Sequence, residues 1–231
     1  MQEEKMTSSD AHVSIAEIIA AIDHTNLDPA ATEREILAFA EAAQASGIAS
    51  LCVQPCYVET LVKHFPGGVP ICTVVGFPNG YETAAIKAAS AAYAFAHGAK
   101  EVDMVVPIGR IKAGEFGHVN HDVQMVLRER PADGVLKVIL ETGALTDTEI
   151  IGVVQVLNQL PIDFYKTSTG FKYPGASVHA AEVIMAHKRA DIQLKVSGGI
   201  RSIEEARTYL SLGATRIGTS KLLPACLDAL Q

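Results

Sequence analysis

The sequence is poor in cysteine, has no excess of basic residues and contains no long apolar run. Only four of its 231 residues are cysteines, at positions 52, 56, 72 and 226, and no two of them form a Cys-x-x-Cys pair. They are expected to be reduced thiols buried in the core rather than zinc ligands. Cys52 ends a predicted strand, so the alternative for this residue is that it borders a functional site.

The charge balance and hydropathy exclude two classes of partner. The net charge is −7, whereas a nucleic-acid partner needs a basic face. No apolar run approaches the roughly 18 residues that cross a bilayer, so no membrane partner is expected. Residues 1–10 are polar and lack the apolar segment of a signal peptide. The sequence therefore predicts a cytoplasmic protein in which residues 1–10 are disordered or an extension.

A His-x-x-His pair is the nearest approach to a metal motif. His118 and His121 stand beside Asp122, but metal sites need three or four convergent ligands. The two histidines are expected at the surface or at a helix cap, and neither a metal nor a cofactor is expected.

Short apolar stretches alternate with segments of helical spacing along the whole chain. Strands are predicted at 22–26, 48–53, 69–75, 101–106, 135–140, 162–165, 192–196 and 215–218. Helices are predicted at 13–21, 32–45, 55–64, 82–97, 115–129, 147–157, 177–187, 203–210 and 221–230. Near-continuous apolar strands that alternate with helices indicate a parallel sheet covered on its outer face.

Eight strand–helix units in a chain of this length favour an α/β fold of the single-domain (β/α)8 TIM barrel type. An open doubly wound sheet is the alternative, but no Gly-x-Gly-x-x-Gly follows the first strand. No proline- or serine-rich linker interrupts the pattern. One catalytic domain over residues 11–231 is therefore predicted.

Lys166 stands at the C-terminal end of the strand predicted at 162–165, and a loop of small residues follows it. An ammonium group loses hydration at such a place. A partly desolvated lysine keeps a fraction of its amine neutral near pH 7, and that amine can attack a carbonyl to form a Schiff base. The alternative is a lysine whose methylene groups lie along an apolar surface while its ammonium group reaches solvent.

Other predicted strands also contain ionisable residues. Lys195, Lys137 and Asp103 each interrupt an apolar run, and period-2 spacing puts Lys137, Ile139 and Glu141 on one face. Uncompensated burial of each group would be costly. We therefore expect these side chains to face one another.

A closed barrel brings these residues towards one mouth, because its functional face lies at the C-terminal ends of the strands. A cation at Lys195 disfavours a second cation nearby and so favours neutral Lys166. Asp103 can accept or donate a proton, and with Lys195 it can relay protons through a water molecule.

Glycines follow the last two predicted strands. Gly198 and Gly199 come after the seventh strand, and Gly218 comes at the end of the eighth. Backbone N–H groups at such turns bind phosphate, and barrels often use these two loops for that purpose. Ordinary turns are the alternative explanation, because glycine is common in them.

The whole chain resembles the 2-deoxyribose-5-phosphate aldolases, a family of class I aldolases with a (β/α)8 barrel. Five segments carry the resemblance: Lys166-Thr167-Ser168-Thr169-Gly170-Phe171, Lys195-Val196-Ser197-Gly198-Gly199-Ile200-Arg201, Glu101-Val102-Asp103-Met104-Val105, Val74-Val75-Gly76-Phe77-Pro78 and Lys137-Val138-Ile139-Leu140-Glu141-Thr142. It implies reversible cleavage of 2-deoxy-D-ribose 5-phosphate to D-glyceraldehyde 3-phosphate and acetaldehyde, and it makes a homodimer plausible.

The resemblance also implies a role for each matching residue. Lys166 is expected to form the Schiff base, Lys195 to favour its neutral form, and Asp103 to belong to the proton relay. The substrate-binding set is Asp23, Thr25, Lys137, Thr169, Gly170, Gly198, Gly199, Gly218, Thr219 and Ser220, with Gly170, Gly198, Gly199, Gly218 and Ser220 holding the phosphate. Some members of the family have a C-terminal tyrosine that assists proton transfer, and this sequence has no tyrosine there. The proton relay is therefore expected to lack that assistance or to need only Asp103, Lys195 and water.

Three other functions remain open from the residues alone. Another Schiff-base enzyme, such as a transaldolase or a ketose-bisphosphate aldolase, would use the same lysine with a different substrate. A phosphosugar isomerase would use the barrel without a covalent intermediate. A non-catalytic phosphometabolite sensor would give no reason for a buried nucleophilic lysine.

Overall fold

A computed structural model describes residues 13–230 of the chain. Residues 1–10, which are predicted to be disordered or an extension, lie outside the described residues. Residues 11, 12 and 231 of the predicted domain also lie outside them. Within the described residues, eight parallel strands close into one barrel, and each strand pairs with the next in sequence order. The last strand pairs with the first, so the predicted (β/α)8 TIM barrel is confirmed.

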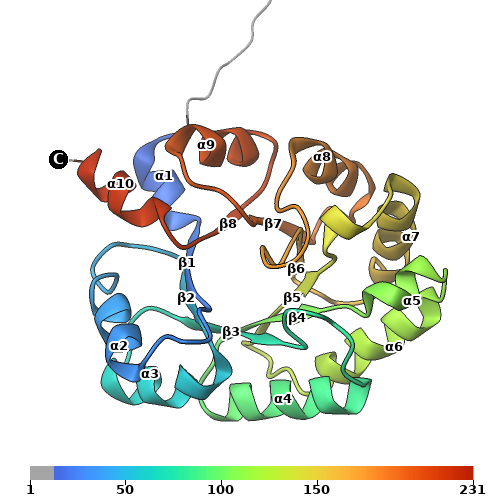
Figure 1. Ribbon diagram of the computed structural model, residues 1–231, viewed down its shortest axis with the longest axis horizontal. Coiled ribbons are helices and arrows are strands. Elements are labelled where there is room, and N and C mark those ends of the chain that lie inside the picture. Colours follow the sequence, from blue (N-terminus) through green and yellow to red (C-terminus); the bar gives the residue numbers. More distant parts are fainter. Residues whose placement is uncertain (1–12, 231) are drawn as a thin grey trace, which may run out of the picture.

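The strands form the inner ring of the molecule, and the helices surround it (Figure 1). The strands are β1 (Ile22–Asn26), β2 (Ser50–Val53), β3 (Ile71–Val75), β4 (Glu101–Val105), β5 (Val135–Ile139), β6 (Phe164–Lys166), β7 (Gln193–Ser197) and β8 (Arg216–Thr219). The α-helices are α1 (Ile15–Ala20), α2 (Glu33–Glu41), α3 (Val58–His64), α4 (Ala84–Ala96), α5 (Ile108–Lys112), α6 (Phe116–Leu127), α7 (Asp147–Leu157), α8 (Val178–His187), α9 (Ile203–Ser211) and α10 (Leu222–Asp228). Two 3-10 turns, η1 (Pro55–Tyr57) and η2 (Thr142–Ala144), complete the set.

Four of the helices begin at a capping box, in which a Ser or Thr side chain and a Glu side chain satisfy each other's backbone N–H groups. The pairs are Ser14 with Glu17, Thr32 with Glu35, Thr146 with Glu149, and Ser202 with Glu205. Because these signals are local, they determine where α1, α2, α7 and α9 start independently of the barrel.

The observed elements differ from the predicted ones at many of their ends and in two short elements that the sequence does not predict, α5 and η2. Helix α2 ends at Glu41, earlier than the predicted residue 45. Helix α5 was not predicted, and it begins directly after Pro107, a residue type that suits a helix start because its missing N–H needs no partner there. None of these differences changes the order of the strands.

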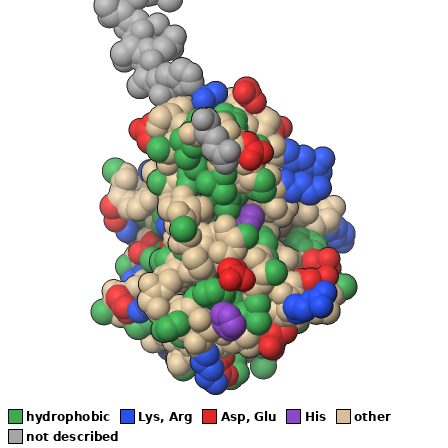
Figure 2. All heavy atoms as spheres, turned by 90° about the vertical axis from the view of Figure 1, so that its left-hand side faces the viewer, with side chains coloured by type: hydrophobic (Ala, Val, Ile, Leu, Met, Phe, Trp, Pro, Cys, Tyr) green, Lys and Arg blue, Asp and Glu red, His purple; other side chains and the backbone are tan. Residues whose placement is uncertain are grey.

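The main apolar core lies between the strands and the helices. Ile18, Leu51, Val102, Leu136 and Val154 are among its fully buried members. On the face of the molecule that Figure 2 shows, charged side chains of both signs are scattered among hydrophobic ones. None of the described helices is both long enough and apolar enough to span a bilayer.

The inside of the barrel is different, because charged side chains fill much of it. Asp23, Asp103, Lys137 and Lys195 are all fully buried, where TIM barrels usually place branched apolar residues. A small apolar cluster of Cys52, Cys72 and Val74 lies apart from the main core. Such a charged interior is stable only if every charge has a partner.

His24 makes the stability of the barrel depend on pH. It lies in β1, stacks on Phe39 with ring centroids 4.1 Å apart, and its Nδ1 is buried without a hydrogen-bond partner among the described residues. Burial lowers the pKa of His24 from 6.5 to about 4. The folded chain therefore binds fewer protons than the unfolded chain as the pH falls from 6.5 towards 4, and stability decreases over that range.

Between pH 7 and pH 5, we expect His24 to lower the free energy of unfolding, measured by urea titration, by at most about 2 kcal/mol. His24→Phe keeps a stacked ring and should remove this part of the pH dependence. His121→Gln, at an exposed position of α6, is the matched control and should leave it unchanged. Equal pH dependence in wild type and His24→Phe would contradict the assignment.

Candidate active site

Strand β6 places Lys166 inside the barrel. Side chains alternate along a strand, and the neighbouring Tyr165 points outward, where its hydroxyl donates to the carbonyl oxygen of Val154 in α7 at 3.0 Å. Lys166 therefore points inward, at the C-terminal end of β6, and only 3% of its surface is exposed. It stands directly beside Lys195, because β6 and β7 pair these two residues in register.

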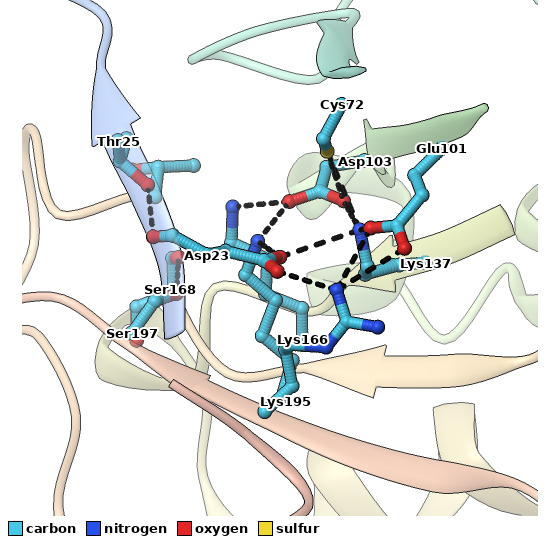
Figure 3. Close-up of polar contacts among 12 residues, drawn as sticks. Asp23, Thr25, Cys72, Glu101, Asp103, Lys137, Lys166, Ser168, Lys195 and Ser197 are labelled. Carbon is cyan, nitrogen blue, oxygen red and sulfur yellow. Dashed lines mark hydrogen bonds and ion pairs between the residues drawn. The ribbon is translucent and has the colours of Figure 1, made fainter. Parts of the chain in front are cut away.

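Asp103 connects the three buried lysines. Its Oδ2 accepts hydrogen bonds from Lys166 Nζ at 2.8 Å and from Lys195 Nζ at 2.7 Å. Its Oδ1 accepts from Lys137 Nζ at 2.9 Å. Figure 3 shows the carboxylate between the three ammonium groups. Lys166, Lys195 and Asp103, which the sequence predicts as a group, thus come from β6, β7 and β4 to one point.

Further charged residues extend this cluster within the barrel. Asp23 Oδ2 accepts from Lys195 Nζ at 2.5 Å and lies 3.4 Å from Lys137 Nζ. Glu101 forms an ion pair with Lys137, and Arg216 bonds to both Asp23 and Glu101. The sequence predicts Asp23 and Lys137 as pocket residues, but it does not identify Glu101 or Arg216 as partners.

The pKa shifts follow from these contacts. Burial alone would raise the pKa of Asp103, but the ammonium groups of Lys137, Lys166 and Lys195 outweigh it and hold that pKa well below its usual value. Burial alone would lower the pKa of Lys195, but Asp103 and Asp23 raise it instead. Burial likewise opposes the charged form of Lys137, and Asp103 and Asp23 again raise its pKa. Asp103 is therefore ionised and both lysines are charged near neutral pH.

A cavity of about 490 Å³ lies at the C-terminal ends of the strands. Its lining includes most of the substrate-binding residues predicted from the sequence, namely Thr25, Thr169, Gly170, Gly198, Gly199, Gly218, Thr219 and Ser220, together with Lys166. Lys195, Asp103, Asp23 and Lys137 are not part of this lining and lie buried within the barrel. Of the three predicted catalytic residues, Lys166 alone lines the cavity.

Glycine is required at two positions of the cavity wall. A Cβ atom at Gly218 would lie 2.7 Å from Ser197 Cβ and 3.1 Å from Lys195 Cε. A Cβ atom at Gly198 would lie 2.8 Å from Gly175 Cα, and Gly198 has a φ of +97°, which L-residues rarely adopt. Both glycines keep the backbone close to the space that a ligand would fill.

Two cationic residues of the lining, Arg201 and Lys221, are absent from the predicted set. Arg201 follows the Gly198-Gly199 pair and Lys221 follows Ser220, so both stand at the loops where a phosphate is expected. The sequence signal was available, since Arg201 closes one of the segments that carry the resemblance. Phe77 was also missed as a site residue, although its ring centroid lies 5.9 Å from Lys166 Nζ, within range of a cation–π contact.

Glu141 does not continue the alternation of β5 as predicted. The strand ends at Ile139, and Glu141 has a φ of 59°, so it is not a strand residue and does not share a strand face with Lys137. Its carboxylate accepts from the backbone N–H of Thr169 at 3.2 Å and from the Thr169 hydroxyl. Burial raises the pKa of Glu141, and the residue links η2 to the loop that follows Lys166.

A larger cavity of about 690 Å³ lies beside the first and is lined by Arg110, Glu141, Lys172 and Tyr173 among others. It does not include Lys166, Thr169 or the glycine loops. The smaller cavity is the one that Lys166 lines, so we take it as the candidate active site.

The cysteines agree with the prediction except at one position. Cys52, Cys72 and Cys226 are buried and free, but Cys56 is exposed, because it lies in η1 outside the barrel. The expectation of a core thiol is therefore wrong for Cys56. Cys72 Sγ lies 3.2 Å from Asp103 Oδ1, so Cys72 borders the site more closely than the sequence suggested.

Among residues 13–230, two groups of side chains offer ligand atoms that could hold a metal ion, Cys52 with Cys72 and Asp103, and Asp23 with Cys72 and Glu101. The three carboxylates already form ion pairs with buried lysines, and a metal ion would have to displace these ammonium groups. His118 and His121 lie at exposed positions of α6, as expected for surface residues.

Comparisons with known proteins find aldolases among the similar sequences and structures. The pattern of the DeoC/LacD family aldolases matches residues 17–226. A deoxyribose-phosphate aldolase of Streptococcus pyogenes serotype M5 (strain Manfredo) is 38% identical over 211 residues, which cover 91% of this chain and 94% of that protein. An aldolase named QR15 has a TM-score of 0.87 at 33% identity and covers 92% of this chain and 97% of its own. A deoxyribose phosphate aldolase from Aeropyrum pernix, described as tetrameric, has a TM-score of 0.81 at 28% identity, with 94% of each chain covered.

Proposed function

The chain belongs to the DeoC/LacD family of aldolases, and on that premise we propose that it cleaves 2-deoxy-D-ribose 5-phosphate reversibly to D-glyceraldehyde 3-phosphate and acetaldehyde through a Schiff base on Lys166. One observation carries the assignment of the lysine. Lys166 is a cavity-lining residue whose Nζ lies 2.8 Å from a buried carboxylate, Asp103. Lys137 and Lys195 are both fully buried beneath the cavity, where a sugar cannot reach them.

The first step joins the substrate to the enzyme. The neutral amine of Lys166 attacks the aldehyde carbon C1 of the open-chain sugar, and loss of one water molecule leaves a protonated imine. The positive nitrogen then acts as an electron sink for the bond that breaks. Phe77, whose ring centroid is 5.9 Å from Nζ, can stabilise this cation through its π-face.

The second step breaks the carbon–carbon bond. A base removes the proton of the C3 hydroxyl, the C2–C3 bond cleaves, and its electron pair moves to the iminium nitrogen to give an enamine. C3 becomes the aldehyde of D-glyceraldehyde 3-phosphate. Asp103 can take this proton through a water molecule, because its carboxylate is ionised and lies 2.8 Å from the Lys166 amine that would carry the substrate.

The last step restores the amine. Protonation of the enamine at C2 followed by addition of water releases acetaldehyde and frees Lys166. Ionised Asp103 and charged Lys195 lie close enough to exchange this proton through the same relay. The steps balance, because formation of the protonated imine takes up one proton and releases one water molecule, and its hydrolysis consumes one water molecule and releases one proton.

The phosphate is assigned to the loops that follow β6, β7 and β8. Gly170, Gly198, Gly199, Gly218 and Ser220 line one wall of the cavity, and backbone N–H groups in such turns bind anions. Arg201 and Lys221 line the same cavity and supply positive charge. Thr25, Thr169 and Thr219 can bind the sugar hydroxyls.

Trapping the intermediate tests this function. Incubation with 2-deoxy-D-ribose 5-phosphate and a borohydride quench should add the mass of the reduced adduct to Lys166, as peptide mass spectrometry would show, and the unquenched reaction should release acetaldehyde. An isomerase would form no adduct, and a transaldolase or ketose-bisphosphate aldolase would release no acetaldehyde. An adduct on another lysine would contradict the assignment of Lys166.

The same proposal extends to assembly and location. We propose a homodimer, on the resemblance alone, and the tetrameric relative from Aeropyrum pernix indicates that self-association occurs among similar proteins. Sedimentation equilibrium separates monomer, dimer and tetramer. A cytoplasmic location fits a charged sugar phosphate as substrate, because such a molecule does not cross a bilayer unaided.

A further inference from the structure

Two charged residues of the barrel interior, the buried Glu101 and the largely buried Arg216, play no part in the proposed reaction. Arg216 is the first residue of β8 and Glu101 is the first residue of β4, so both lie towards the N-terminal end of the barrel, opposite the cavity. The exposed fraction of their side chains is 14% and 7%. Neither of them bonds to Lys166 or lines the cavity.

These two residues are nevertheless joined to the site by a chain of ion pairs. Arg216 lies 2.9 Å from Glu101 and 2.5 Å from Asp23. Asp23 in turn binds Lys195 at 2.5 Å, and Glu101 binds Lys137. Lys195 and Lys137 both contact Asp103, the partner of Lys166. Arg216 therefore reaches Lys166 through three consecutive ion-pair partners, Asp23, Lys195 and Asp103.

The formal charges of this connected network do not balance when every member is ionised. It contains four cations, Lys137, Lys166, Lys195 and Arg216, and three anions, Asp23, Glu101 and Asp103. The sum is +1 with Lys166 protonated and zero with Lys166 neutral. An unbalanced charge is costly in a buried site, so the network favours the loss of one proton.

Lys166 is the member best placed to lose that proton. Its one ion pair among the described residues is with Asp103, and it shares that oxygen with Lys195. Lys137 has three acidic partners and Lys195 has two, and these acids raise the pKa of both lysines against the effect of burial. The Arg216 guanidinium stays charged at all accessible pH values.

We infer that Arg216 and Glu101 determine how much of Lys166 is neutral, acting at a distance through the ion pairs of Asp23, Lys137, Lys195 and Asp103. They are positioning residues, and the reaction step itself does not involve them. This inference rests on the proposed function, since it concerns the amine that forms the Schiff base. It assigns the N-terminal end of the barrel interior an electrostatic role in a reaction that occurs at the C-terminal ends of the strands.

The groups that face Lys166 come from several elements and stay constant in the test below. Asp103 faces it from β4 and Lys195 from β7. Glu141 and Cys52 lie within electrostatic range, from the segment after β5 and from β2, and the Phe77 ring lies over the amine. Glu141 bonds to Thr169 and forms no ion pair with the network. The variants therefore change only the remote charges.

The test measures the initial rate at which 2-deoxy-D-ribose 5-phosphate forms the borohydride-trapped adduct on Lys166, as a function of pH. Arg216→Met removes a cation and should move the midpoint of this pH profile upward, on the order of one pH unit. Glu101→Gln removes an anion and should move it downward by a similar amount. The double variant restores the sum of +1 and should return the midpoint close to that of wild type, and Arg216→Lys, which keeps the charge, should leave it near wild type.

Opposite shifts that cancel in the double variant support the inference, because a merely structural role would lower the rate without moving the midpoints in opposite directions. Midpoints that stay fixed, or that move the same way in both single variants, would overturn it. If Arg216→Met does not fold, Glu101→Gln and the double variant still decide the question. Absence of any adduct on Lys166 in wild type would instead overturn the proposed function, so the two failures can be told apart.

Discussion

Lys166→Arg is expected to abolish turnover of 2-deoxy-D-ribose 5-phosphate, with kcat reduced on the order of 10⁶-fold, the scale that follows the loss of a covalent nucleophile. Arginine keeps the positive charge beside Asp103, so the ion pair at the floor of the cavity can persist. The guanidinium does not lose its proton at accessible pH and cannot attack an aldehyde. The loss should therefore fall on chemistry while the fold is retained.

The measurement is the release of acetaldehyde, coupled to a circular dichroism melting curve of the same preparation. Lys63→Arg is the matched control, because Lys63 is a highly exposed lysine of α3 that pairs with Glu59, and its replacement should leave turnover unchanged. A Lys166→Arg variant that turns over at the rate of wild type would remove the Schiff base from the mechanism.

The barrel and the central part of the site are predictable from the sequence for a common physical reason. Strand–helix alternation gives eight parallel strands, and closure of such a sheet places the C-terminal ends of all strands at one mouth. Lys166, Lys195 and Asp103 interrupt apolar strands, where an unpaired charge would be costly. A sequence that keeps all three in strands therefore predicts that they meet, as they do at Asp103.

The contact between Glu101 and Arg216, at the N-terminal end of the barrel, could not be predicted in the same way. Glu101 and Arg216 are each the first residue of a strand, a position where a charged residue commonly reaches solvent. β4 and β8 are not neighbours in the barrel, so no strand pairing brings these two residues together. Their side chains meet across the barrel interior, and this contact forms only because both side chains point inward.

Glu141 was mispredicted for a local reason. Strand alternation assumes that the strand continues, but β5 ends at Ile139 and Glu141 is the only described residue other than glycine with a positive φ. Such a conformation is costly for a residue with a side chain. Its two hydrogen bonds to Thr169, which lies in the following loop, supply compensation that sequence spacing does not reveal.

Asp103→Asn is expected to separate the formation of the imine from the cleavage of the carbon–carbon bond. The asparagine amide is close in shape to the carboxylate but is a much weaker base, so it cannot take the proton of the C3 hydroxyl. Cleavage should fall about 10²- to 10⁴-fold, as expected when a general base is lost. Imine formation needs neutral Lys166, and the loss of an anion from the network favours that neutral form.

The stability of the barrel should fall in the same variant. Asp103 is the acid shared by Lys137, Lys166 and Lys195, and its replacement leaves these buried ammonium groups with fewer counter-charges. Breaking a buried ion pair by removing one partner costs about 3–5 kcal/mol, which urea titration can measure. Deprotonation of Lys166 offsets part of this cost, so the loss should be smaller at higher pH.

Two measurements on Asp103→Asn therefore decide the role of the carboxylate. Borohydride trapping with 2-deoxy-D-ribose 5-phosphate should still label Lys166, while the release of D-glyceraldehyde 3-phosphate should be almost lost. Asp122→Asn is the matched control, because Asp122 is also paired with a buried lysine, Lys87, but joins α6 to α4 away from the barrel interior. It should lower stability and leave cleavage intact. If Asp103→Asn cleaves as fast as it forms the adduct, the proton must leave by a route that does not include Asp103.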